Sequence, residues 1–171
     1  HPELLISYGG KKILDPGLPE ARKYVLSVVS DVLRRYDVDG IHFDDYFYPY
    51  PVAGESFDDA ASFSKYNPDN LSLSDWRRSN VTAFISDVSK VVHSLKPWVQ
   101  FGVSPFGVWR NIRDDENGSQ SRAGITNYDV LFADVKLWAE QGLVDYLVPQ
   151  VYWESGYEFA DFDVLTKWWS E

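Results

Sequence analysis

The sequence contains neither cysteine nor methionine among its 171 residues. The absence of cysteine excludes a disulfide framework and any zinc site built from thiolates. The absence of methionine, even at position 1, predicts that the chain is a processed or excised piece of a longer protein. No apolar run approaches the roughly 20 residues that a membrane-spanning helix needs, so no span is expected.

Positive charge is scarce as well, because 16 Lys and Arg residues stand against 26 Asp and Glu residues and the net charge is −10. A chain this acidic, without a basic patch, repels nucleic acid at long range, so no nucleic-acid partner is expected. Aromatic residues, by contrast, reach 16%. Their flat amphipathic rings suit the faces of sugars, and they equally suit an ordinary protein core.

Helical and strand patterns alternate along the whole chain. The spacing of apolar residues predicts helices over residues 19–36, 75–96 and 130–141 and from residue 162 onward. Ser74 is expected to cap the second of these helices. Strands are predicted over residues 41–45, 99–105 and 144–152, and loops over residues 1–19, 46–73 and 106–127. Such alternation favours parallel strands with right-handed crossovers.

Two parallel architectures fit this order of elements. A doubly wound sheet usually carries a glycine-rich phosphate loop after its first strand, whereas Asp44, Asp45 and Tyr46 stand there. A barrel places long polar loops at the carboxyl ends of its strands, as this sequence does, but a full barrel needs at least about 200 residues. We therefore expect an α/β fold in which residues 1–171 form a single fragment of a (β/α)8 TIM barrel with long βα loops.

Side chains alternate along a strand, so each predicted strand has a helix-facing and an inner side. The residues expected to face helices are Ile41, Phe43, Phe101, Val103, Leu147 and Val151. The polar or aromatic residues expected to meet at one open mouth are His42, Asp44, Tyr46, Ser104, Gln150 and Tyr152. Asp45 has the opposite parity, which indicates a capping or loop-fixing role.

Four segments carry a resemblance to a known family: DPGLPEAR (15–22), YDVDGIHFDDYFYPY (36–50), FGVSPFGVWRN (101–111) and DYLVPQVYW (145–153). Together they resemble the bacterial glycoside-hydrolase-like family ten, over nearly the whole chain. The resemblance implies a (β/α)8 barrel, of which this piece runs from about strand four to helix six. It also implies hydrolysis of glycosidic bonds, with peptide-free peptidoglycan strands as one attributed substrate, by an exported and often lipid-anchored protein.

The first strand segment is also similar to two other barrel signatures. It follows the pattern Asp-Gly-x-Asp-x-Asp-x-Glu of family-18 chitinases at Asp39 and Asp44, but His42 and Tyr46 replace an Asp and the catalytic Glu. A chitinase mechanism is therefore not expected. The spacing of His42 and Asp44 imitates the nucleophile strand of alpha-amylase barrels.

Glycoside hydrolysis usually needs one ionised and one protonated carboxyl group. Asp44 is the expected nucleophile or stabilising base, and His42 is expected to hold it through a charge-assisted hydrogen bond. The expected acid is Glu154, followed by Asp45 and then Glu116. Residues expected to bind sugar hydroxyl or acetamido groups or to stack on rings are His42, Tyr46, Tyr48, Ser104, Trp109, Arg110, Gln150, Tyr152 and Trp153.

Two other functions remain open at this stage. A metal-dependent carbohydrate deacetylase carries a Phe-Asp-Asp motif like residues 43–45, but it needs two further His at helical spacing, and none are present. No metal or cofactor is therefore expected. A non-catalytic glycan-binding domain is the stronger alternative, because it would use the same aromatic and polar residues. The open edges of a partial barrel are also expected to promote self-association.

Overall fold

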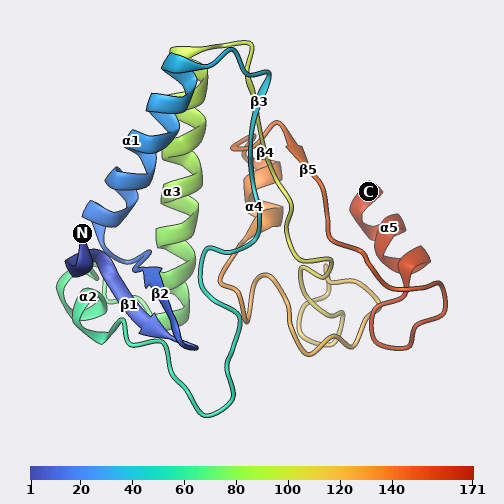
Figure 1. Ribbon diagram of the computed structural model, residues 1–171. Coiled ribbons are helices and arrows are strands. Elements are labelled where there is room, and N and C mark those ends of the chain that lie inside the picture. The colour runs from blue at the N-terminus through green and yellow to red at the C-terminus, as the bar shows by residue number, and fades with distance from the viewer.

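The computed structural model describes all 171 residues as a mixed α/β structure (Figure 1). Its elements are a 3-10 turn η1 (Pro2–Leu4), β1 (Leu5–Tyr8), β2 (Lys11–Leu14), α1 (Pro19–Arg35), β3 (Gly40–Phe43), α2 (Ala60–Lys65), α3 (Leu73–Leu95), β4 (Gln100–Val103), α4 (Val135–Glu140), β5 (Tyr146–Leu147) and α5 (Phe162–Ser170). Strands β3, β4 and β5 form a parallel sheet in that order. Parallel strands separated by helices are compatible with part of an α/β barrel.

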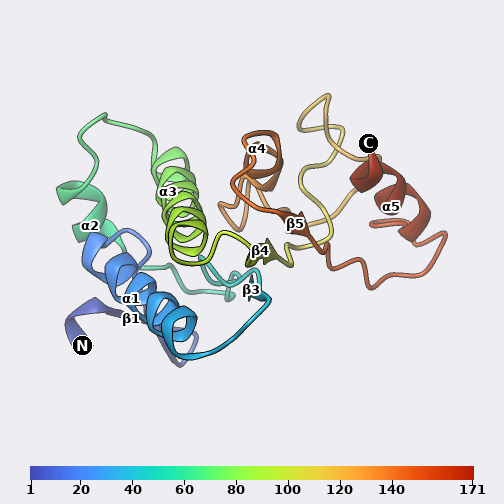
Figure 2. The same ribbon diagram turned by 90° about the horizontal axis from the view of Figure 1, so that it is seen from above.

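Helices pack against one face of this sheet. In both views α1 and α3 lie side by side, and from above α3 and α4 lie on the same side of the three strands (Figures 1 and 2). Phe101 and Val103 of β4 are fully buried there, and Phe43 of β3 stacks on Phe84 of α3 with ring centroids 5.7 Å apart. The prediction that these strand residues face helices is confirmed. None of the helices combines the length and apolar character that a membrane crossing requires.

The first residues of the chain form a hairpin, so the prediction of a loop there is wrong. Strands β1 and β2 pair antiparallel from Leu5 opposite Leu14 to Tyr8 opposite Lys11. The two residues between the strands, Gly9 and Gly10, have φ values of 57° and 70°. Two successive positive φ angles make the tight turn whose twist matches a hairpin, and glycine adopts them without steric cost.

Two predicted helix starts also require correction. Ser72 caps α3 in place of Ser74, because its hydroxyl accepts the backbone N–H of Asp75 at 3.1 Å. Helix α4 begins at Val135, five residues later than predicted, since Phe132 has a left-handed φ of 54° that no helix accommodates.

The third predicted strand is reduced to the two residues of β5. Pro149 has no N–H to continue the ladder. Only a bridge between Phe106 and Gln150 extends the pairing beyond it.

The long segment after β3 is tied to the helices by buried polar groups. It contains α2, which the sequence did not predict, and Ser62 of α2 donates a hydrogen bond of 2.7 Å to buried Asp15. Burial raises the pKa of Asp15 above its usual value, against the lowering effect of that bond. Arg77 of α3 forms a bidentate ion pair with buried Asp59 just before α2. These contacts hold the segment against α3.

Candidate active site

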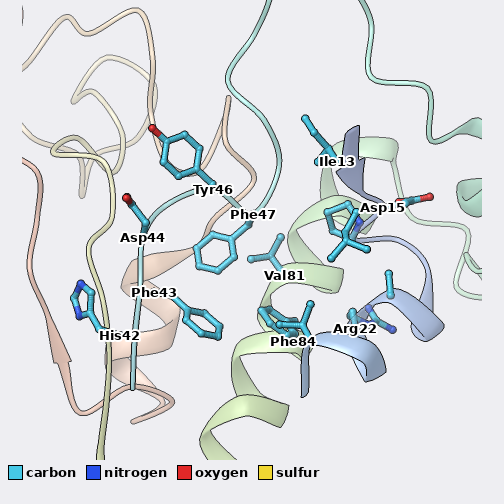
Figure 3. A pocket seen from close by; sticks show the side chains of 14 residues that line it. Ile13, Asp15, Arg22, His42, Phe43, Asp44, Tyr46, Phe47, Val81 and Phe84 are labelled. Atoms are coloured by element: carbon cyan, nitrogen blue, oxygen red, sulfur yellow. The ribbon is translucent and has the colours of Figure 1, made fainter. Parts of the chain in front are cut away.

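Strand β3 presents alternate residues to opposite sides of the sheet. His42 and Phe43 point to opposite sides of the strand, and Asp44 follows at its carboxyl end (Figure 3). His42 and Asp44 are exposed, while Ile41 and Phe43 pack against the core of the helix side. The strand thus delivers both polar residues to the open face, as the alternation predicts.

Asp44 is held through one of its two carboxylate oxygens. Its Oδ1 accepts a hydrogen bond of 2.8 Å from the side-chain amide of Gln150 and another of 2.8 Å from the backbone N–H of Asp45. Its Oδ2 accepts no hydrogen bond within the chain. The arrangement holds one oxygen of an exposed carboxylate and leaves the other without a hydrogen bond from the chain.

His42 makes no hydrogen bond to Asp44, so that expectation is wrong. The Nε2 of His42 pairs with the hydroxyl of Ser104 at 2.8 Å, and Nδ1 pairs with the hydroxyl of Tyr146 at 3.1 Å. Residues two apart on one strand are separated by about 6.6 Å, whereas a neighbouring strand lies only about 4.8 Å away. Ser104, which follows the adjacent strand β4, is therefore nearer to His42 than its neighbour along β3, and Tyr146 reaches His42 from β5 across Gly102 of β4.

Tyr146 is a member of this face that the sequence analysis missed. Its ring stacks on His42 at 5.6 Å with an interplanar angle of 17°. Gly102 lies opposite Tyr146 in the sheet, and a Cβ at position 102 would meet the tyrosine ring at 2.2 Å. Two signals were available, since Tyr146 has the same parity as Gln150 and a glycine inside a strand often marks a close approach.

Asp45 lies away from the mouth and fixes the loop that follows β3. It is only 2% exposed, and its carboxylate accepts the hydroxyl proton of Tyr50. Burial raises the pKa of Asp45, and the bond from Tyr50 partly opposes this rise. Burial likewise raises the pKa of Tyr50, so the phenol remains a donor. This geometry matches the loop-fixing role that its parity indicates and disfavours direct contact with a substrate.

The structure places other expected site residues at the open face. Tyr46 and Tyr152 are 73% and 85% exposed. The hydroxyl of Ser104 pairs with His42, and its backbone carbonyl accepts a hydrogen bond from the side chain of Gln150. Glu154 is exposed in the loop after β5, and its carboxylate makes no hydrogen bond or ion pair within the chain. The two exposed tyrosines and Glu154 therefore remain accessible to a ligand.

Two aromatic residues expected to stack on sugars are buried, which corrects that expectation. Tyr48 is 1% exposed and packs edge-on against Phe57 and Phe132. Trp109 is 6% exposed and lies parallel to Trp168 at 5.9 Å. Their faces are covered by neighbouring rings, because the loops that carry them fold back onto the helices and add to the core.

Arg110 and Trp153 are also engaged within the chain. Arg110 donates to Asp129 and Asp115 at 2.8 Å each, so both ends of its guanidinium are paired. Trp153 is partly buried and packs edge-on against Phe106 with centroids 5.5 Å apart. Arg110 therefore fixes the loop after β4 and is not free to bind a sugar as expected, whereas the indole N–H of Trp153 makes no hydrogen bond within the chain.

A cavity of about 430 Å³ lies along β3, and His42 and Tyr46 of the candidate site are among the residues that line it (Figure 3). Phe43, Phe47, Val81 and Phe84 make its wall largely apolar, and Asp44 also lines it. Strand β3 has only one neighbour in the sheet, so this cavity runs along an edge with unpaired backbone groups. Its apolar lining suits protein side chains better than a sugar. No group of three His, Cys, Asp or Glu side chains is placed to hold a metal ion.

Comparison with known proteins shows to which family the chain is similar. Residues 2–171 match the family described as Glycosyl hydrolase-like 10. The glycosyl hydrolase YngK of Bacillus subtilis strain 168 is 45% identical over 171 residues, which are 99% of this chain and 34% of the relative. The glycosyl hydrolase DigH of Escherichia coli strain K12 is 44% identical over 171 residues, which are 100% of this chain and 38% of the relative.

The chain thus spans little more than a third of the length of these relatives. The match nevertheless extends over every strand of the parallel sheet and over the residues at its open face. Because the match covers nearly the whole chain, the chain belongs to the Glycosyl hydrolase-like 10 family.

Proposed function

We propose that this chain supplies part of the active site of a glycosidase, with Asp44 as the nucleophile or the stabilising base. The observation that carries the proposal is the exposed carboxylate at the end of β3, which is held at Oδ1 by two donors and has no hydrogen bond from the chain at Oδ2. A glycosidase needs such an ionised oxygen near the anomeric carbon. The names of the relatives, both glycosyl hydrolases, support the same reaction class.

The proposed substrate is a bacterial cell-wall glycan, in particular peptidoglycan strands without their peptides, and the proposed location is outside the cytoplasm. The bacterial sources of the relatives support a bacterial substrate. Tyr46 and Tyr152 offer exposed rings beside the mouth, and flat rings pack well on sugar faces. Glu154 is the proposed acid, because it is the accessible carboxyl in the loop after β5, whereas Asp45 is buried.

The proposed scaffold is a (β/α)8 barrel in which β3, β4 and β5 are strands four to six. The parallel order of the strands supports it, and so does the apolar cavity along the unpaired edge of β3. A preceding barrel strand would pair with that edge and fill the cavity with side chains. The greater length of the relatives provides residues for such a strand.

The substitution Asp44→Asn in the full-length protein tests the assignment. We expect turnover of peptide-free peptidoglycan strands to fall by orders of magnitude while glycan binding persists, since the amide keeps the shape and loses the charge. Asp37→Asn is the matched control, because Asp37 is fully exposed before β3 and should leave turnover unchanged. Mass spectrometry identifies the released products, and the amount of product formed over time gives the rates. If Asp44→Asn retains more than about a tenth of the turnover, a loss below about 1.4 kcal/mol, Asp44 is not the nucleophile.

A non-catalytic glycan-binding domain is the second candidate. It is favoured by the fact that the carboxyl group adjacent to Asp44, that of Asp45, is buried and occupied by Tyr50. Saturable glycan binding without any released product from the unsubstituted full-length protein would establish this candidate. Product release that depends on Asp44 would exclude it.

A further inference from the structure

The side-chain amide of Gln150 lies between two hydrogen-bond acceptors. Its Nε2 is 2.8 Å from Oδ1 of Asp44 and 2.9 Å from the backbone carbonyl oxygen of Ser104. A carboxylate and a carbonyl both accept, so only a group with two N–H donors satisfies both at once. Glutamine provides that group at this length, and an ionised glutamate in its place would face two acceptors without a donor.

The backbone of Gln150 is itself fixed. Its N–H donates to the carbonyl of Pro105 at 2.9 Å, and the residue bridges to Phe106 in parallel register. The carbonyl oxygen of Gln150 lies so near Gly107 that a Cβ at position 107 would be 2.6 Å from it. The close approach of these two segments sets the point from which the Gln150 side chain reaches Asp44.

We propose that Gln150 is a positioning residue for Asp44 and not a sugar-binding residue. Resting on the glycosidase function proposed above, this assigns Oδ2 as the oxygen that faces the anomeric carbon. Both protons of the Gln150 amide nitrogen are committed within the chain, so that nitrogen has none left for a sugar hydroxyl. The pair of donors on Oδ1 prevents the carboxylate from exchanging its two oxygens by rotation. The position of Oδ2 is therefore set before substrate binds.

The test compares Gln150→Ala and Gln150→Glu in the full-length protein, with peptide-free peptidoglycan strands as substrate. For Gln150→Ala we expect kcat to fall about tenfold to a hundredfold, because a misplaced reacting group loses rate on this scale. KM should change less than about threefold, since no sugar contact is lost. Gln120→Glu, on an exposed loop residue, is the control for the added charge and should match the unsubstituted protein. A sugar-binding role would instead raise KM and leave kcat nearly unchanged.

The isosteric Gln150→Glu variant separates positioning from damage to the fold. Near neutral pH the introduced carboxylate repels Asp44, whereas at lower pH the pair takes up one proton and an O–H donor returns. We expect the rate of this variant, relative to the unsubstituted protein, to rise several-fold between about pH 7 and about pH 5. A relative rate that stays constant over this range would overturn the proposal. A folding defect alone would not make the relative rate depend on the protonation of the introduced carboxylate.

A readout without activity keeps this inference distinct from the proposed function. In 15N-labelled full-length protein, the side-chain amide signals of Gln150 should shift with pH as a carboxyl titrates, and Asp44→Asn should greatly reduce this shift, leaving only what the neighbouring Asp45 contributes. If the titration is present but no glycan is cleaved, the glycosidase proposal fails and the hydrogen bond stands. If glycan is cleaved but Asp44→Asn leaves the amide signals of Gln150 and their pH dependence unchanged, the positioning role is wrong and the glycosidase proposal stands.

Discussion

The buried ion pair between Arg77 and Asp59 allows a quantitative test of how the long segment after β3 is held. The Nε and Nη2 atoms of Arg77 donate to the two oxygens of Asp59 at 2.8 Å and 2.7 Å. The two side chains are only 13% and 2% exposed, and the guanidinium carbon lies 4.9 Å from the ring centroid of Phe132. Arg77→Met removes the cation, keeps most of the volume and leaves Asp59 buried without its counter-ion.

Loss of one partner from a buried pair typically costs about 3–5 kcal/mol. With a urea dependence of about 2 kcal/mol per M, the unfolding midpoint should fall by about 1.5–2.5 M. Arg35→Met is the matched control, because Arg35 also donates through Nε at 2.8 Å to an aspartate, Asp31, but the side chains are 69% and 53% exposed. An exposed pair of this kind contributes less than about 1 kcal/mol.

Urea unfolding followed by circular dichroism measures both variants. Adding Asp59→Asn to Arg77→Met should recover part of the loss, since a neutral amide is less costly to bury than an unpaired carboxylate. If Arg77→Met lowers the midpoint no more than Arg35→Met does, the pair does not hold the segment and the reasoning is refuted.

Two further predictions concern the loop after β3 and the edges of the sheet. Tyr50→Phe removes the donor to buried Asp45 and should cost about 1–3 kcal/mol near neutral pH. This cost in unfolding free energy should shrink as the pH falls through the raised pKa of Asp45, because the protonated carboxyl no longer needs that donor. Equal shifts of the urea midpoint at pH 7 and at about pH 3.5 would contradict this. Residues 1–171 expressed alone should self-associate through the open edges of β3 and β5, as measured by light scattering. A dilute monomer with full glycosidase activity would show that the edges need no cover.

The side of the sheet that each strand residue occupies could be predicted from sequence, because alternation is local. Phe43, Phe101 and Val103 pack under helices as their parity requires, and Asp44 lies on the open face. The β1–β2 hairpin was missed although its Gly-Gly turn is a hairpin signal. Its strands are four residues each, and Lys11 and Lys12 stand side by side in β2, so apolar and polar residues hardly alternate there.

The burial of loop residues could not be predicted, because it depends on which other segments fold over them. Tyr48 stands in a stretch dense in proline, glycine and aspartate, a composition typical of an exposed loop. Phe57, Phe132 and Arg77 nevertheless surround its ring, and two of these come from other segments of the chain. No local pattern around Tyr48 contains that information.

The partners within the site depend on the register between strands, which the sequence of a single strand does not encode. In the structure His42 lies opposite Gly102, and Gly102 lies opposite Tyr146, so the absence of a side chain in β4 lets the tyrosine reach across to the histidine. A shift of one residue in β5 would turn Tyr146 toward the helices and bring Leu147 to the open face. The contact of Gln150 with Asp44 depends on the same register, continued past Pro149 by the bridge to Phe106. The hydrogen bond that leaves Oδ2 of Asp44 without a partner in the chain therefore forms only when β3, β4 and β5 pair in this register.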